Sequence, residues 1–360
     1  MGKRIEYFDT KKGIAIVLVV FCHYVVLSND SFGGNIMMSL AWAAVPCFFL
    51  VTGGLMHKNE KFERGKYFRR IVKVYIVLSI WKLIYLVVYG IMNHVTFTKV
   101  ELVKYLFLFG DISNVDTGLM WFMYAYLTAL LFFPITYFLF HNGKDGRRIL
   151  VYIAVLLFAR SIFVTSVDFL LENMTKVLHL NTISIQQITM INPYGSYPNM
   201  MFYFVVGAFL LEYRSKIEHY LKKYKSVQGF SLILIIVGMI GLLLIKFYDI
   251  HSFRWQGVYL QNGYNRFATL LLAIGMYLLI QSMEGNRLSR FLAEYIGKET
   301  MGIYYLHFPI TAILLKYINP LIVDQYSLGL NVIKTVIVLA LCIFITRVLK
   351  RVPFVKKLVS

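Results

Sequence analysis

Charged side chains are scarce in this 360-residue sequence: Asp, Glu, Lys and Arg make up 15% of it, and hydrophobic residues make up 59%. Soluble domains contain about 25% charged and about 45–50% apolar residues. Such an inventory cannot cover a water-facing surface. The composition therefore excludes an ordinary soluble protein and indicates a polytopic membrane protein.

Cysteine is nearly absent as well. The three cysteines, Cys22, Cys47 and Cys342, all lie inside apolar runs, which is typical of small buried hydrophobes and excludes a disulfide framework. The sequence also lacks a Gly-x-Ser-x-Gly elbow, a Walker-type phosphate loop, a His-Glu-x-x-His motif and paired Cys-x-x-Cys motifs. Typical hydrolase, ATPase and zinc sites thus lack their residues. We expect no metal site, no permanently bound cofactor and no cleavable signal peptide.

Apolar runs of about 20 residues are the dominant pattern, and each is typical of a transmembrane helix. Ten such runs can be drawn, at approximately 12–28, 36–56, 70–92, 118–140, 148–167, 198–212, 229–248, 266–283, 300–317 and 329–349. The sixth is short and the fifth carries Arg160. The sequence predicts an all-α protein with about ten transmembrane helices, organised as a single membrane domain over residues 1–360.

Basic residues alternate between the two sides of this predicted bundle. Of the 37 Lys and Arg residues, 27 fall in the two terminal segments and every second loop, 7 fall in the opposite loops, and Lys82, Arg160 and Lys334 lie inside spans. Cytoplasmic loops carry such an excess, so both termini are expected in the cytoplasm. The net charge of +19 is then a topology signal, and no nucleic-acid partner is expected.

Two predicted external segments are long, at about 93–117 and 168–197. The first contains Asp111 and Asp116, and the second ends in the sequence Asn192-Pro193-Tyr194-Gly195-Ser196-Tyr197. Aromatic and amide side chains at an outer surface suit contacts with sugars. They also suit the aromatic belt found at membrane interfaces, which is the more common place for a single Tyr.

The first apolar run carries a histidine. Lys12 and His23 are eleven residues apart, which is about three helical turns and roughly 16 Å along a helix axis, so both project from nearly the same face. An ionisable side chain near mid-bilayer is costly and indicates a functional group facing the protein interior. Alternatively, His23 simply forms a hydrogen bond with a neighbouring helix.

Basic residues also open the third run. Lys66, Arg69, Arg70 and Lys73 follow the i, i+3, i+4, i+7 spacing of one helical stripe. Such a stripe suits phosphate binding, or else topology and attraction to anionic lipid. His307 is a second histidine inside a span, and the two histidines would share a cavity if their helices pack together.

Five motifs run along the chain in a fixed order. They are Asp9-x-x-Lys12-Gly13-Ile14-Ala15 with His23, Pro46-x-Phe48-Phe49-Leu50-Val51-Thr52-Gly53, Phe68-Arg69-Arg70-Ile71-x-Lys73, Trp121-Phe122-Met123, and Gly297-x-x-Thr300-Met301-x-Ile303-Tyr304-x-Leu306-His307. In this order the chain resembles the acyltransferase-3 family, integral membrane enzymes that acylate surface polysaccharides and related envelope acceptors.

The resemblance implies roles for particular residues. His23 corresponds to the family's essential histidine, and Lys12 stands where the family usually has Arg, so both are implied to be catalytic. Arg69, Arg70 and Lys73 are implied to bind the acyl donor, with Lys73 replacing the second Arg of an Arg-x-x-Arg motif. Lys keeps the charge but loses the bidentate fork of Arg. Supporting positions in the matching motifs are Asp9, Trp121, Tyr304 and His307.

The implied activity is an O-acetyltransferase in the bacterial cytoplasmic membrane. It would take an acyl group, with acetyl expected, from cytoplasmic acetyl-CoA or another acyl-CoA to a hydroxyl of a surface polysaccharide or lipid-linked glycan. The implied partners are acyl-CoA, that glycan and the lipid bilayer. One alternative is a polysaccharide exporter or transporter without acyl transfer, and a second is a sensory or amino-acid-recognition membrane domain.

Overall fold

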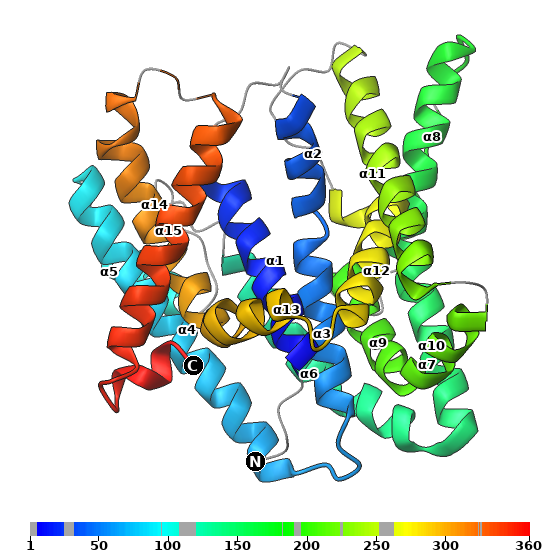
Figure 1. Ribbon diagram of the computed structural model, residues 1–360, viewed down its shortest axis with the longest axis horizontal. Helices are drawn as coiled ribbons and strands as arrows, with labels where there is room; N and C mark the ends of the chain where they lie inside the picture. The colour runs from blue at the N-terminus through cyan, green and yellow to red at the C-terminus, as the bar shows by residue number, and fades with distance from the viewer. Residues whose placement is uncertain are drawn as a thin grey trace. The chain divides into compact units, whose positions relative to one another are not determined.

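The computed structural model describes residues 6–24, 32–94, 96–107, 120–181, 183–190, 196–223, 226–251, 263–322, 324 and 326–360. Over these residues the chain folds into helices and contains no β-strand (Figure 1). The predicted all-α class is confirmed.

Seven helical stretches among the described residues are long and apolar enough to cross a membrane. They are Phe32–His57, Arg64–Asn93, Trp121–His141, Gly143–Thr175, Val227–Lys246, Arg287–Leu321 and Leu328–Leu349. Two shorter apolar helices are α9 (Pro198–Glu212) and α12 (Phe267–Ser282). Together with α1 (Glu6–Tyr24), these stretches match the ten predicted apolar runs one for one. The chain is a polytopic membrane protein.

Two of the predicted spans are not single regular helices. The second divides into α2 (Phe32–Ala41) and α3 (Ala44–His57), with a turn at Trp42 and Ala43. The fifth runs through α7 (Gly143–Phe158), the π-helical segment η2 (Ala159–Phe163) and α8 (Val164–Val177). Arg160 lies in η2, where its guanidinium donates a hydrogen bond to the Thr189 carbonyl oxygen. A π-helical turn inside an α-helix locally interrupts the i to i+4 ladder.

The remaining helices complete the chain. They are α4 (Arg64–Asn93), α5 (Lys99–Phe107), α6 (Trp121–His141), α10 (Arg214–Lys223), α11 (Val227–His251), α13 (Arg287–Phe291), α14 (Thr300–Tyr317) and α15 (Leu328–Leu349). The short helix α5 falls in the first predicted external segment. Asp111, Asp116 and the sequence from Asn192 to Gly195 lie outside the described residues.

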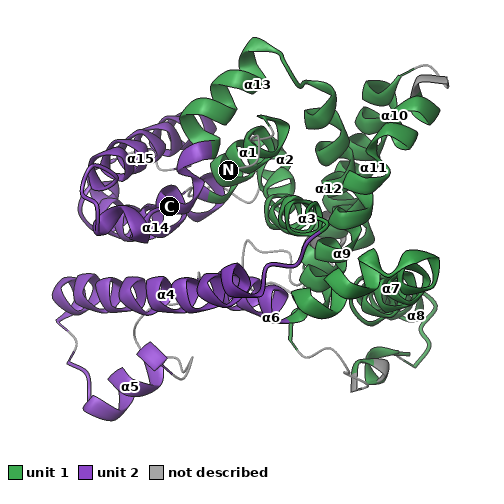
Figure 2. Cartoon of the chain, turned by 90° about the horizontal axis from the view of Figure 1, so that it is seen from below, with its two compact units in different colours: residues 1–19, 28–60, 132–297 green, residues 20–27, 61–131, 298–360 purple. Residues whose placement is uncertain are grey.

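The chain forms two compact units (Figure 2). Unit 1 comprises residues 1–19, 28–60 and 132–297, and unit 2 comprises residues 20–27, 61–131 and 298–360. The helices α1 and α6 each contribute residues to both units. The expectation of a single domain over residues 1–360 stays a prediction.

Unit 1 contains a close helix pair, α3 and α9, whose backbones meet at glycines. A Cβ atom on Gly53 would lie 1.8 Å from the Phe204 carbonyl oxygen, and one on Gly207 would lie 2.0 Å from the Leu50 carbonyl oxygen. Small residues at such crossings let membrane helices approach closely and gain packing contacts.

In unit 2, α4, α5 and α14 pack against one another through aromatic side chains. The rings of Trp81 on α4 and Tyr305 on α14 are stacked, with centroids 5.0 Å apart and planes 1° apart. The Tyr85 hydroxyl donates a hydrogen bond to the Tyr305 carbonyl oxygen. These contacts fix α14, which carries His307, against α4.

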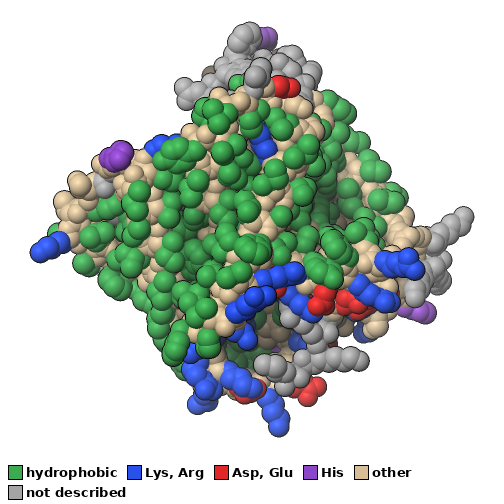
Figure 3. Space-filling view, turned by 60° about the vertical axis from the view of Figure 1, so that its left-hand side comes forward, with side chains coloured by type: hydrophobic (Ala, Val, Ile, Leu, Met, Phe, Trp, Pro, Cys, Tyr) green, Lys and Arg blue, Asp and Glu red, His purple; other side chains and the backbone are tan. Residues whose placement is uncertain are grey.

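Large hydrophobic side chains are exposed on the outer helix faces. Examples are Ile76 on α4, Leu131 on α6 and Phe344 on α15, which are 50%, 63% and 67% exposed. The face in Figure 3 is covered mostly by hydrophobic side chains, with Lys and Arg gathered toward one end. Exposed apolar faces of this extent fit contact with lipid.

Candidate active site

His23 and His307 lie side by side in unit 2. Their ring centroids are 5.4 Å apart, and their planes are inclined by 55°. His23 lies in the last turn of α1 and is half-buried. Its Nδ1 lies 3.5 Å from the Cys22 Sγ. His307 is fully buried on α14. The structure therefore brings together the two histidines that the sequence placed in separate spans.

Hydrogen bonds set the tautomer of His307. Its Nδ1 lies 2.6 Å from the Tyr304 carbonyl oxygen and 3.1 Å from the Ile303 carbonyl oxygen. Carbonyl oxygens only accept, so Nδ1 carries the proton and neutral His307 has its lone pair on Nε2. Among the described residues, this buried Nε2 has no hydrogen-bond partner. A buried acceptor without a partner is costly in a structural role, so it is a candidate contact for a substrate or for His23.

Aromatic residues enclose one side of the histidine pair. The Tyr304 ring lies 6.0 Å from the His307 ring and 5.2 Å from the Phe122 ring, measured between centroids. Trp121 precedes Phe122 at the start of α6 and is half-buried. The structure thus places Tyr304 in the histidine site and joins Trp121 to it through its neighbour Phe122.

The basic residues proposed for donor binding lie on α4 and are exposed. Arg69 donates a hydrogen bond to the Gly65 carbonyl oxygen of its own helix. Arg70 donates through Nε to the Tyr126 hydroxyl, at 3.1 Å. Lys73 donates to the Ser360 carbonyl oxygen, at 2.9 Å. Because α4 is regular from Arg64 onward, the predicted stripe of cations along one helical face is present.

Lys12 lies in unit 1 and forms an ion pair with Asp9. Its Nζ lies 2.5 Å from the Asp9 Oδ1, and the two side chains are 26% and 6% exposed. The two residues are three apart on α1, which places them on one face of the helix. Asp9 thus supports Lys12 directly. One uninterrupted helix, α1, carries both Lys12 and His23.

Lys11 is a buried cation that the charge pattern of the sequence places only among the basic residues of the N-terminal segment. It is fully buried in unit 1, with its Nζ 3.0 Å from the Tyr277 ring centroid and 4.5 Å from the Tyr7 ring centroid. It also donates a hydrogen bond to Gln281 Oε1, at 3.3 Å. Tyr7 and Lys11 have i, i+4 spacing, which was the one local sequence signal for this cation–π contact.

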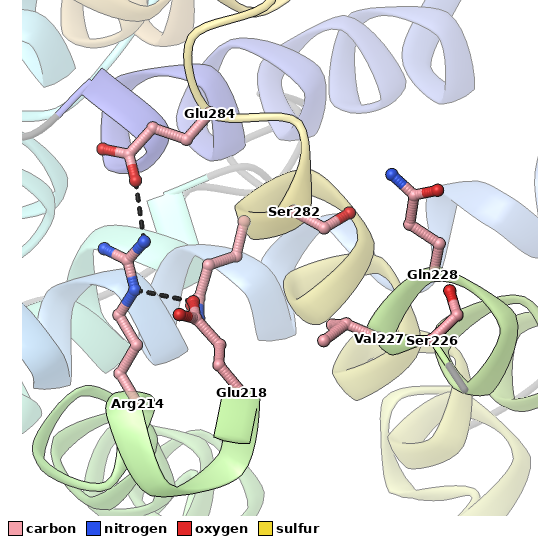
Figure 4. Close-up of a pocket in the computed structure, with 8 residues that line it drawn as sticks. Arg214, Glu218, Ser226, Val227, Gln228, Ser282 and Glu284 are labelled. Atoms are coloured by element: carbon pink, nitrogen blue, oxygen red, sulfur yellow. Dashed lines mark hydrogen bonds and ion pairs between the residues drawn. The ribbon is translucent and has the colours of Figure 1, made fainter. Parts of the chain in front are cut away.

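A polar cavity of about 440 Å³ lies in unit 1 beside this network (Figure 4). Its lining includes Arg214, Glu218, Gln281 and Glu284. Gln281 donates to Glu218, and Arg214 pairs with Glu218 at 2.9 Å and with Glu284 at 2.7 Å. Burial lowers the pKa of Arg214, but its hydrogen bonds with the two carboxylates outweigh that effect and raise the pKa above its ordinary value. Figure 4 shows the Arg214 guanidinium joined to the Glu218 and Glu284 carboxylates, so this arginine is held by two ion pairs.

No group of three or more His, Cys, Asp or Glu side chains suitable for a metal ion occurs within the described part of the chain. In that part, His23 and His307 form a pair of imidazoles without a third ligand. The arrangement is suited to proton transfer or to nucleophilic attack by an imidazole.

In a comparison with known protein families, residues 5–347 match a family model described as an acyltransferase domain. No curated protein and no solved structure matches the chain. The family match covers the histidine pair, the Asp9–Lys12 pair and the basic stripe of α4.

Proposed function

Because the chain belongs to the acyltransferase-3 family and is a membrane acyltransferase, we propose that it transfers an acyl group from acyl-CoA to a glycan hydroxyl. The expected acyl group is acetyl, the donor is cytoplasmic, and the acceptor is a surface polysaccharide or a related envelope glycan. The single observation that carries this proposal is the pairing of His23 with His307 inside unit 2.

His23 is proposed as the reacting histidine. As a neutral imidazole it takes the proton from the acceptor hydroxyl while the hydroxyl oxygen attacks the thioester carbonyl carbon. The carbon–sulfur bond then breaks, and the proton passes from His23 to the departing CoA sulfur. In the other route, His23 itself accepts the acyl group and passes it to the hydroxyl. Both routes produce the same ester and free CoA.

His307 is proposed to position His23. Its Nδ1 proton is held by the Tyr304 carbonyl oxygen, so its Nε2 presents a lone pair. The 5.4 Å separation of the two rings is short enough for a nitrogen of each to share a hydrogen bond. Such a bond would orient His23 and stabilise it when it carries the proton.

The exposed stripe of Arg69, Arg70 and Lys73 is proposed to bind the phosphates of the donor. Acyl-CoA is polyanionic, and the stripe lies on the predicted cytoplasmic side. An Arg guanidinium such as that of Arg70 can bind phosphate through two parallel hydrogen bonds, whereas Lys73 offers a point charge. Donor binding at Lys73 would replace its hydrogen bond to Ser360. Lys12, held by Asp9, is proposed to orient the donor, because it stands about three helical turns, roughly 16 Å, from His23 along α1.

The experiment uses membranes that contain the full chain, incubated with acetyl-CoA labelled in its acetyl group. Wild-type membranes are expected to release CoA and to transfer label into envelope glycan. His23→Ala membranes should do neither. The matched control is His219→Ala, because His219 is an exposed histidine on α10 of unit 1, and this variant should match wild type. Equal transfer by His23→Ala and wild type would contradict the role of His23.

A further inference from the structure

Two more buried polar groups follow His307 along the packed pair α14 and α15 in unit 2. Thr311 is 1% exposed and lies one turn after His307 on α14, and Lys334 is 3% exposed on α15. Among the described residues, neither the Thr311 hydroxyl nor the Lys334 ammonium has a hydrogen-bond partner. Native proteins rarely leave buried polar groups in this condition, so each requires an explanation.

The register of the two helices places these groups near one another. The helices α14 and α15 are antiparallel neighbours, and Gly302 packs against Thr346 where the first begins and the second ends. Measured along the helix axes from this contact, Lys334 on α15 lies within about one helical turn of the level of Thr311 on α14. Figure 2 shows the two helices together in unit 2.

The Lys334 side chain also adjoins the histidine helix. Its Nζ lies 5.9 Å from the centroid of the Tyr24 ring, and Tyr24 directly follows His23. Three buried polar atoms without a hydrogen-bond partner among the described residues therefore follow one another away from the histidine pair. They are His307 Nε2, Thr311 Oγ1 and Lys334 Nζ. This series runs toward the connection between α14 and α15, which the charge pattern of the loops places outside the cell.

The burial of the Lys334 ammonium is not explained by a role as a topology signal or by contact with lipid headgroups. A lysine that extends its ammonium to the membrane surface keeps that ammonium exposed, whereas Lys334 is covered by protein atoms. The acid that acts on it electrostatically is Asp324. Asp324 is exposed, accepts a hydrogen bond from the Tyr326 backbone and forms no ion pair with Lys334 among the described residues. A buried cation with such weak compensation destabilises a fold.

We propose that Lys334 and Thr311 bind an anionic acceptor glycan, with the Lys334 ammonium holding a carboxylate or phosphate beside the hydroxyl that is acylated. The Thr311 hydroxyl, between Lys334 and His307 along the series, forms a hydrogen bond with the sugar. This inference rests on the proposed function and names the substrate class of the same site. The bound anion is proposed to belong to the acceptor. The phosphates of the donor are already proposed to bind Arg69, Arg70 and Lys73 near the start of α4.

The first test identifies the sugar that the protein acylates. Envelope glycan is isolated from cells with and without the wild-type protein, and NMR locates the acyl ester that depends on it. We expect the acylated sugar or its direct neighbour to carry a carboxylate or a phosphate, and NMR of carbon and phosphorus distinguishes the two. A neutral acylated repeat would overturn the inference but leave the proposed function intact. If no ester depends on the protein, the proposed function and this inference both fail.

The second test removes the charge of Lys334. Lys334→Met should lower acyl transfer about 10-fold or more through a raised acceptor KM, with the donor KM unchanged, because a buried charge contact is lost. Lys334→Arg should restore part of the transfer. The matched control is Lys316→Met, because Lys316 is an exposed lysine on α14 that donates to the Met92 carbonyl oxygen, and this variant should behave as wild type.

A purely structural role gives the opposite result. Replacing an uncompensated buried cation by Met would then raise the Tm and leave the acceptor KM unchanged, which would overturn the proposal. If Lys334→Met does not accumulate in membranes, Thr311→Val serves as the second variant. It removes only the hydroxyl at nearly constant volume and should raise the acceptor KM alone.

Discussion

At the scale of single residues, the two histidines of the site differ in how they are held. His307 is fully buried and bonded through Nδ1 to two carbonyl oxygens of its own helix. His23 is half-buried and has the thiol of Cys22 beside its Nδ1. The more accessible ring is better placed to meet a substrate, which is why we propose the chemical step for His23 and the positioning for His307.

The first prediction uses a third histidine, His57, to distinguish a loss of catalysis from a loss of folding stability. His57 is buried in unit 1, where one ring nitrogen lies 2.8 Å from the Gly53 carbonyl oxygen and the other 2.9 Å from the Thr136 hydroxyl. His57→Ala should cost about 1–3 kcal/mol of stability and leave the turnover of folded protein intact. His23→Ala should lower kcat about 100-fold or more with little change in Tm. Thermal unfolding and kinetics check both, and a large loss of turnover in folded His57→Ala would contradict the assignment.

The second prediction concerns the basic stripe of α4. Arg70 is tied to Tyr126, whereas Arg69 donates to the Gly65 carbonyl oxygen one turn earlier in its own helix. A preorganised guanidinium loses less entropy on binding phosphate. Arg70→Ala should therefore raise the donor KM about 10-fold, and Arg69→Ala should raise it less. Both effects should shrink at high salt. An unchanged donor KM in the double variant would exclude the stripe as the donor site.

Sequence patterns predicted part of this site. Helical spacing put Lys12 and His23 on one face and the α4 cations in one stripe, because these relations are local. The contact of His23 with His307 joins positions 284 residues apart, so periodicity could only raise it as a possibility. The burial of Lys11 was missed because Tyr277 and Gln281 enclose it from another helix. The burial of Lys334 was missed because one apolar run does not say which of its faces is covered.

At the scale of elements, the third prediction concerns the close contact of α3 with α9 at Gly207. A Cβ on Gly207 would overlap the Leu50 carbonyl oxygen at 2.0 Å, and backbone atoms on both sides leave no flexible side chain to move. Gly207→Ala should push α3 and α9 apart and lower stability by about 1–3 kcal/mol. The control is Gly65→Ala, since the nearest atom to its Cβ is 3.8 Å away. This variant should match or slightly exceed wild type in Tm. A Tm for Gly207→Ala equal to that of the control would refute the contact.

The fourth prediction is a pH effect on α5. The Thr98 hydroxyl and backbone N–H donate to the Glu101 carboxylate, and the Glu101 N–H donates to the Thr98 hydroxyl, which is a capping box. Hydrogen bonds from Thr98 lower the pKa of Glu101. A lowered folded pKa contributes stability above the unfolded value of about 4.3, and that stability is lost as the pH falls through the folded pKa.

Hydrogen exchange of the first turn of α5, corrected for the intrinsic rate, should therefore show less protection at pH 3 than at pH 6. Glu101→Gln keeps a capping side chain but cannot titrate, so its protection should hardly change between these two pH values. Equal pH dependence in the two proteins would rule out Glu101 as the cause.

Elements were predictable from the sequence to the extent that hydrophobicity determines them. Apolar runs located the ten apolar helical stretches found among the described residues. The turn at Trp42 and Ala43 was not predicted, because it depends on packing: a Cβ on Gly263 would lie 2.4 Å from the Trp42 ring. Neither was η2, whose Arg160 bonds to the distant Thr189 carbonyl oxygen. The helix α5 was hidden because nine residues are too few for a clear periodic signal.

At the scale of the whole molecule, composition and the family match lead to the same conclusion. A chain with 59% hydrophobic residues and exposed apolar helix faces must lie in a bilayer, and the acyltransferase family model covers residues 5–347. Membrane placement lets an acyltransferase take its donor from one side and an acceptor from the other. The predicted topology, with the α4 cations inside and the α14–α15 connection outside, agrees with that division. A polysaccharide exporter would also use ten helices with intramembrane His and Lys, but it would move glycan without an acyl donor.

The most direct test of acyl transfer to an envelope glycan measures the O-acyl content of surface glycan from cells that lack the protein. The cells are complemented with wild type or with stably expressed His23→Ala. We predict that acyl groups disappear on deletion, return with wild type and stay absent with His23→Ala. If the glycan itself disappears while acylation of the remaining glycan is unchanged, the protein is an exporter and the account is contradicted.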